Sequence, residues 1–137
     1  MLMANLRIGG KDFDAKQSAK ELGLGRDSYV LKGEVIKSGP KKGRKHPVSH
    51  LVIGLSDNDN MPDHVAEVEQ ELDDLWLFLA EQRRKAKSPL EIWLSTGFTV
   101  GGDPDFARGV RMPPALLSKL AAMEIACETW AYPCSDE

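Results

Sequence analysis

The feature that most constrains this chain is residues 62–87, which we predict to form one long amphipathic helix. Asn60 can cap its first turn, and Pro62 suits a helix start, where a missing N–H costs nothing. Apolar side chains recur at steps of three and four, which gathers them on one face of a helix: Val65, Val68, Leu72, Leu75 with Trp76, and Leu79. Such a stripe has to be covered, and we expect it to pack on a β-sheet.

The remainder of the chain alternates between short strands and helices. Asp14 caps a short helix that ends at Gly23, and Pro113 opens a third helix with Leu116, Leu117 and Leu120 facing inward. The glycine-rich residues 97–112 are expected to form a long irregular loop. The predicted strands cover residues 5–8, 28–37, 48–55, 90–96 and 124–132.

This order predicts a single α+β domain over residues 1–137. Its first six elements follow the ferredoxin-like βαββαβ plan, an antiparallel sheet with helices on one face, and a C-terminal helix and strand extend it. A chain of 137 residues buries enough surface to need no metal or disulfide. Cys127 and Cys134 lie too close together to form a disulfide framework, and we expect both to be reduced.

The sequence also indicates where the protein resides. No window approaches the ~18 consecutive apolar residues that a membrane span needs, and the first ten residues lack the apolar core of a signal peptide. We therefore expect a cytoplasmic protein with no membrane partner, either a monomer or a homodimer.

One face of the predicted sheet is left open by the helices. Strand alternation directs Val30, Val52, Trp93, Trp130 and Tyr132 to that face. Exposed aromatic patches are typical of interaction sites, although the loop 97–112 or the C-terminal tail can also cover them. Eight acidic residues between positions 57 and 74 add an anionic surface suited to a basic partner. The predicted partner-binding residues are Trp93, Trp130, Tyr132, Val52, Asp57, Asp59, Glu69 and Asp73.

A basic connector offers an alternative function. Residues 37–46 are rich in glycine and proline and hold five cationic side chains without an acid, typical of a solvated hairpin tip but also of a phosphate-binding loop. The net charge of −3 argues mildly against a dedicated nucleic-acid binder. In this alternative, an RNA-binding module, the contacts would come from Lys37, Lys41, Lys42, Arg44 and Lys45.

The motifs of catalysis are absent from the sequence. His46 and His50 are too far apart on an extended strand to share a metal, and His64, among carboxylates, is expected at the surface. Residues 57–60 resemble the start of a calcium loop but lack its glycine and glutamate. We find no phosphate-binding glycine loop, zinc spacing or nucleophile elbow. The prediction is a protein that is not an enzyme and has no cofactor, metal or catalytic residue.

Several short motifs resemble a known family. Leu22-Gly23-Leu24, Lys32-Gly33-Glu34, the strand around residues 49–56 and the closing segment 120–132 are similar to those of the bacterial family called domain of unknown function 4279. That family has no established catalytic residues to carry over. Small acidic α+β proteins of this kind resemble the immunity proteins that accompany bacterial toxins. The resemblance implies a protein that neutralises a cognate toxin by covering its active site.

Overall fold

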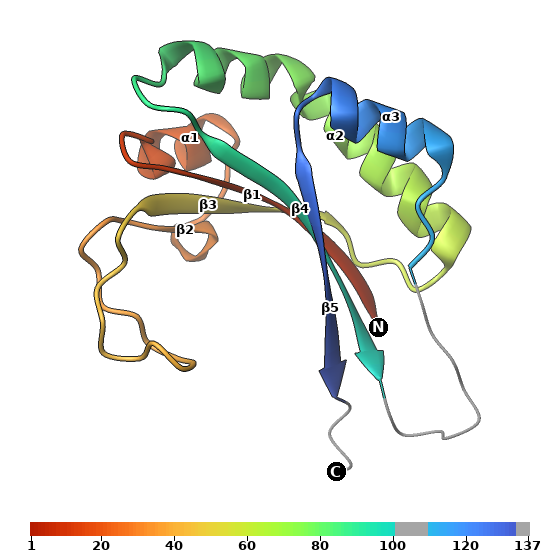
Figure 1. Ribbon diagram of the computed structural model, residues 1–137, viewed down its shortest axis with the longest axis horizontal. Coiled ribbons are helices and arrows are strands. Elements are labelled where there is room, and N and C mark those ends of the chain that lie inside the picture. Colours follow the sequence, from red (N-terminus) through yellow and green to blue (C-terminus); the bar gives the residue numbers. More distant parts are fainter. Residues whose placement is uncertain (101–109, 134–137) are drawn as a thin grey trace. The chain divides into compact units, whose positions relative to one another are not determined.

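The computed structural model describes residues 1–100 and 110–133, which form an α+β fold with a five-stranded mixed sheet and three α-helices (Figure 1). The strand order in the sheet is β2-β3-β1-β4-β5. The elements are β1 (Leu2–Gly10), α1 (Ala15–Glu21), a short 3-10 helix η1 (Arg26–Ser28), β2 (Tyr29–Val30), β3 (Ser49–Ser56), α2 (Met61–Lys85), β4 (Glu91–Val100), α3 (Pro114–Ala122) and β5 (Ala126–Pro133).

The predicted fold class is confirmed as α+β, but the sheet is not the antiparallel one that we expected. β2 pairs with β3 antiparallel, whereas β5 pairs with β4 parallel. The parallel pair arises because α3 carries the chain back before β5 begins, so that both strands run in one direction. The ferredoxin-like arrangement is therefore not confirmed.

The chain divides into two compact units. The β5 unit comprises Met1–Leu6, Gly54–Phe78 and Trp93–Glu137, and the α1 unit comprises Arg7–Ile53 and Leu79–Ile92. Each has its own buried apolar residues. In the β5 unit these include Leu6, Val68, Leu72, Leu94 and Leu116, and in the α1 unit they include Ile8, Ala15, Ala19, Leu51 and Leu79.

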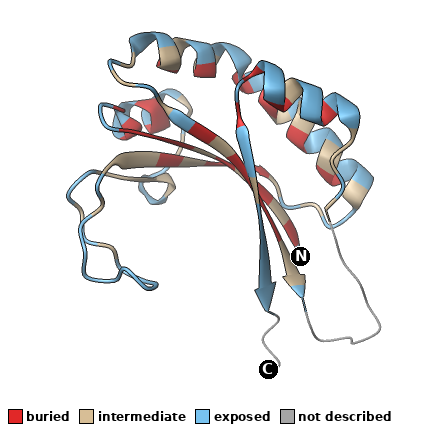
Figure 2. Cartoon of the chain, in the orientation of Figure 1, coloured by how far each residue is buried: buried red, intermediate tan, exposed pale blue. Residues whose placement is uncertain are grey.

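The long helix α2 forms where its sequence predicts. Asn60 caps it, since its Oδ1 accepts a hydrogen bond from the backbone N–H of Asp63 at 3.2 Å. Figure 2 shows the buried stripe along one side of the helix, which contains Val68, Leu72, Leu75 and Leu79. Trp76, which we grouped with this stripe, is 44% exposed, because it lies one residue beyond Leu75 and so about 100° around the helix.

The other helices follow local chemistry as well. Asp14 caps α1 by accepting from the N–H of Gln17 at 3.0 Å, and Gly23 ends it with a φ of +69°. α3 begins at Pro114 and buries Leu116 and Leu120. Leu117 was wrongly predicted to face inward; it is adjacent to Leu116 and therefore points to solvent.

Three strands differ by several residues from their predicted ranges because pairing, not residue type, decides where a strand ends. The first strand was predicted over residues 5–8, whereas β1 covers Leu2–Gly10. The strand expected over residues 28–37 contains only Tyr29–Val30, since Gly33 takes a φ of +91° and the chain continues as an irregular hairpin. β4 extends to Val100 because Gly97–Val100 pairs with Trp130–Pro133. The remainder of the predicted loop, residues 101–109, and Cys134 lie outside the described residues.

No helix in residues 1–100 and 110–133 is both long enough and apolar enough to cross a membrane.

Candidate interaction surface

The two faces of the β4–β5 pair are identified by their contacts. In a parallel ladder, side chains that are register partners lie on the same face. Thr96 and Thr129 are partners, and their hydroxyl oxygens are 3.0 Å apart. Thr96 and Leu94 line a small cavity together with residues of α2 and α3, among them Val68 and Leu116. This face is therefore the one that the two helices cover within the β5 unit.

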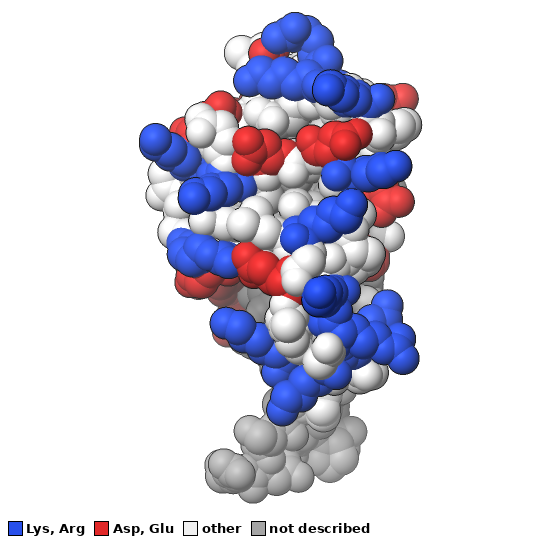
Figure 3. Space-filling view, turned by 90° about the vertical axis from the view of Figure 1, so that its left-hand side faces the viewer, with Lys and Arg blue, Asp and Glu red and all other residues white. Residues whose placement is uncertain are grey.

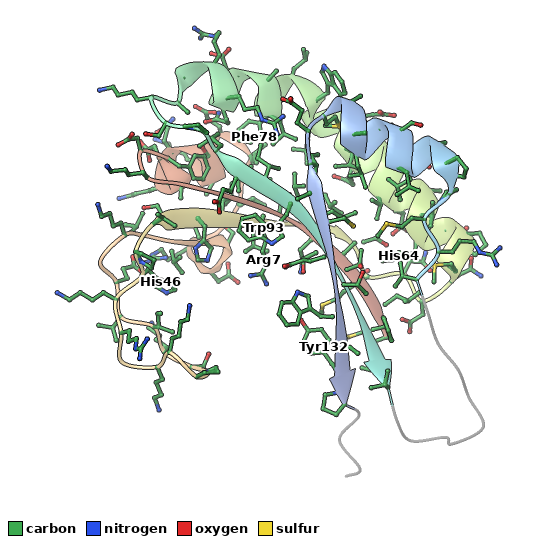
Figure 4. All side chains as sticks on the ribbon, viewed as in Figure 1. Arg7, His46, His64, Phe78, Trp93 and Tyr132 are labelled. Atoms are coloured by element: carbon green, nitrogen blue, oxygen red, sulfur yellow. The ribbon has the colours of Figure 1, made fainter. Side chains whose placement is uncertain are left out.

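Alternation places three aromatic residues on the opposite face. Trp93 is one residue from Leu94 on β4, and Trp130 and Tyr132 are one and three residues from Thr129 on β5. Their side chains therefore point to the face opposite that of Leu94, Thr96 and Thr129. Figure 4 shows Trp93 and Tyr132 on the side of the strands away from α2 and α3. The predicted orientation of these three side chains is confirmed.

Contacts within this face hold the rings in place. The Trp93 Nε1–H donates a hydrogen bond to Glu128 Oε1 at 2.9 Å. The Tyr132 ring lies directly over Gly97, where a Cβ atom would come within 2.8 Å of the ring and 3.2 Å of Met3. Any larger residue at this position would displace the tyrosine ring. We call the surface formed by Met3, Trp93, Glu128, Trp130 and Tyr132 the aromatic face.

The aromatic face is accessible to solvent. Trp130 is 51% exposed and Tyr132 40% exposed, whereas Trp93 is half-buried. β5 is the last strand in the order of the sheet, and Figure 2 shows it exposed along most of its length. An edge strand presents unpaired backbone N–H and C=O groups beside its side chains, and both can contact another molecule.

The predicted acidic residues do not lie on the aromatic face. Asp59 accepts from the backbone N–H of Leu2 at 2.7 Å and lies 3.7 Å from the N-terminal ammonium, so it anchors the start of β1. Asp73 forms an ion pair with Lys119 of α3 at 2.7 Å, and the same ammonium donates to the Glu69 carbonyl at 3.3 Å. Glu69 and Asp73 therefore lie on the helix side, where they connect α2 to α3.

Asp57 and Val52 complete the predicted set. Asp57 is exposed in the segment between β3 and α2. Val52 belongs to the α1 unit, where it is half-buried in β3. Sequence reasoning missed Met3 and Glu128; the alternation of Leu2, Ala4 and Leu6 as buried residues was the signal for Met3.

The two units carry opposite charge. The β5 unit contains 14 Asp and Glu and 3 Lys and Arg, whereas the α1 unit contains 7 Asp and Glu and 15 Lys and Arg. The formal net charges are therefore −11 and +8, which the total of −3 conceals. The five basic residues predicted for the alternative function are all exposed in the α1 unit: Lys37, Lys41, Lys42, Arg44 and Lys45.

His64, which we expected at the surface, is buried in the first turn of α2. It is 2% exposed, and its Nδ1 has no hydrogen-bond partner among the described residues. Burial lowers its pKa, because the charged imidazolium is poorly solvated there. The sequence prediction was wrong because it weighed the surrounding carboxylates and not the helix face; His64 is four residues before the buried Val68.

The described residues offer little for metal chemistry. No group of three or more His, Cys, Asp or Glu residues in that part of the chain could hold a metal ion.

A pocket of ≈ 660 Å³ lies beside the start of α2, and its lining includes Met61, Pro62, Val65, Val110, Arg111 and Pro113.

Comparison with known proteins found no matching family model, no matching curated protein and no matching solved structure. The resemblance to the domain of unknown function 4279 family therefore rests on the short motifs alone.

Proposed function

We propose that this is a non-enzymatic binding protein whose aromatic face docks a protein partner with a basic surface. The observation that carries this proposal is the exposure of Trp130 and Tyr132 on an edge strand. Tryptophan and tyrosine contribute most of the binding energy in many interfaces, because they bury a large apolar area and lose little side-chain entropy.

The charge of the β5 unit supports a basic partner. A formal charge of −11 on a unit of this size attracts a cationic surface and speeds its encounter. The apolar rings would then supply the short-range contact, while the acids elsewhere in the unit supply the long-range attraction. Asp73 and Asp59 already have cationic partners within the unit, so the free acids on which this attraction depends are others, such as Asp57 and Asp63.

The more specific form of the proposal is an immunity protein that neutralises a cognate bacterial toxin. Enzymes that cleave nucleic acid bind their substrate in a basic groove, and an acidic protein that covers such a groove prevents access without catalysing any reaction. This form rests on the family resemblance as well as on the acidic β5 unit.

The experiment is to mix the purified protein with the product of the gene immediately upstream and to analyse the mixture by size-exclusion chromatography at physiological salt. The proposal predicts a stoichiometric complex and loss of the toxin's activity in the same mixture. Separate elution of the two proteins at micromolar concentrations, with toxin activity intact, would refute the immunity function.

A further inference from the structure

The α1 unit has a surface that the proposed function does not use. Its formal charge is +8. Figure 3 shows one face of the protein, over which Lys and Arg side chains are spread with Asp and Glu side chains among them. The most concentrated part is the irregular hairpin of residues 33–46. Its backbone is held by hydrogen bonds from Gly33 N–H to the His46 carbonyl at 2.9 Å and from Ile36 N–H to the Arg44 carbonyl at 2.7 Å.

The hairpin displays its charges outward. Gly39 and Gly43 take φ values of +85° and +90°, which allow the tight turns that carry the lysines away from the sheet. The acid within the hairpin, Glu34, is already paired with Arg26 at 2.5 Å. Its carboxylate therefore does not neutralise the lysines, and the tip retains its positive charge.

A second group of basic side chains, His46, His50 and Arg7, lies where the hairpin joins the sheet. His46 and His50 have ring centroids 5.5 Å apart in an edge-to-face arrangement. His50 precedes the buried Leu51 in β3, so its side chain points to the opposite face of the sheet. Its register partner on β2 is Val30. Arg7 follows the same alternation in β1, where Leu6 and Ile8 are buried.

These three side chains create a positive environment with an unused donor. The pKa of His50 is lowered, first by burial and then by the positive charges of His46 and Arg7. The Arg7 Nε–H is buried and has no hydrogen-bond partner among the described residues. Such a group usually has a partner, and an anion is the partner that a guanidinium favours.

We propose that Arg7, His46, His50 and the hairpin lysines form a binding surface for single-stranded nucleic acid. The lysines and Arg44 would contact successive phosphates, Arg7 would bind one phosphate at the sheet, and the imidazole rings would provide a stacking surface for a base. This surface is independent of the aromatic face, and neither proposal depends on the other.

The composition of the hairpin favours nucleic acid over other anionic partners. Residues 37–45 contain no aromatic or large aliphatic side chain, and Val35 is the one large apolar residue of the hairpin that is exposed. A membrane-binding loop needs apolar anchors, and a protein interface needs an apolar centre, so both fit this segment poorly. A chain of phosphates requires only spaced cations and hydrogen-bond donors.

The test is fluorescence anisotropy of a labelled 20-nucleotide oligouridylate with the full-length protein, titrated from 50 to 200 mM salt. The expected result is binding that weakens steeply with salt, with a slope of about −0.7 for each phosphate contacted. A deoxyribonucleotide of the same length distinguishes RNA from single-stranded DNA. Absence of binding at 50 mM salt, or binding to phosphatidylserine vesicles in place of both oligonucleotides, would overturn the proposal.

Two double variants with the same change in net charge test whether nucleic-acid binding depends on the hairpin or only on the overall charge of the protein. Lys41→Glu/Lys42→Glu in the hairpin should weaken binding at least about tenfold and reduce the salt slope by about 1.4. Lys16→Glu/Lys20→Glu makes the same change in net charge on the exposed side of α1 and should weaken binding less than threefold. Equal losses in both variants would show that only net charge matters and would refute the site.

A single variant addresses Arg7. Arg7→Met keeps most of the apolar stem that packs in the sheet and removes the guanidinium, so we expect weaker binding with an unchanged circular dichroism spectrum. If that spectrum changes, Arg7→Lys provides the comparison: it restores the charge but not the Nε–H, and it should bind more weakly than the original protein. Unaltered binding by a folded Arg7→Met variant would remove Arg7 from the site.

Discussion

Replacing Leu72 by alanine tests whether the apolar stripe of α2 is the core that the fold depends on. Leu72 is fully buried, so the substitution removes three carbon atoms from a close-packed site. Lost transfer free energy at about 0.8 kcal/mol per methylene accounts for about 2 kcal/mol. The remaining cavity adds to this, and we expect a total loss of about 2 to 5 kcal/mol in the free energy of unfolding.

Leu77→Ala is the matched control, because Leu77 is on the same helix and is 80% exposed. The chemical change and the change in helix propensity are identical in the two variants, so only burial differs. Urea unfolding followed by circular dichroism should give a loss within about 0.5 kcal/mol for Leu77→Ala. Comparable losses for both variants would refute the assignment of the buried face.

Three further predictions follow from individual side chains. Because burial lowers the pKa of both His50 and His64, the unfolded chain takes up protons below its own histidine pKa of about 6.5 while the folded protein does not. The free energy of unfolding should therefore fall as the pH drops from 7 to 5.5, by at most about 1.4 kcal/mol per pH unit for each histidine. In the double variant His50→Gln/His64→Gln, the free energy of unfolding measured in urea should depend less on pH. An unchanged pH dependence would contradict the assignment. Asp59→Ala removes the acceptor of the Leu2 N–H and should cost about 1 kcal/mol in thermal unfolding, whereas the exposed Asp57→Ala should leave the melting temperature unchanged. Partial burial and the neighbouring Glu128 raise the pKa of the Cys127 thiol, so in a Cys134→Ala background it should react with a thiol reagent at pH 7 more slowly than free cysteine does, and an equal rate would show that the thiol is not shielded.

Local chemistry made much of the fold predictable. The cap at Asn60, the spacing of Val68, Leu72 and Leu79, and the stop at Gly23 each depend on residues that are close in sequence. The direction of β5 and the length of β4 could not be predicted in the same way, because both follow from pairing between segments about 33 residues apart.

The candidate surfaces were likewise predictable only where they depend on local sequence pattern. Period-two alternation was enough to place Trp93, Trp130 and Tyr132 on one face. The partners of Asp59 and Asp73 are Leu2 and Lys119, which are distant in sequence, so the structural roles of these acids were not visible from local pattern. The isolated donor of Arg7 likewise becomes apparent only when the atoms around it are known.

The most direct test of the aromatic face compares two tryptophan variants in calorimetric titrations with the partner protein. Trp130 on β5 and Trp76 on α2 are 51% and 44% exposed, so Trp130→Ala and Trp76→Ala remove similar accessible side chains from different surfaces of the β5 unit. We predict that Trp130→Ala weakens the affinity by about thirtyfold or more, whereas Trp76→Ala changes it less than about threefold. Equal effects, or a larger loss for Trp76→Ala, would contradict the proposal that the aromatic face is the docking surface.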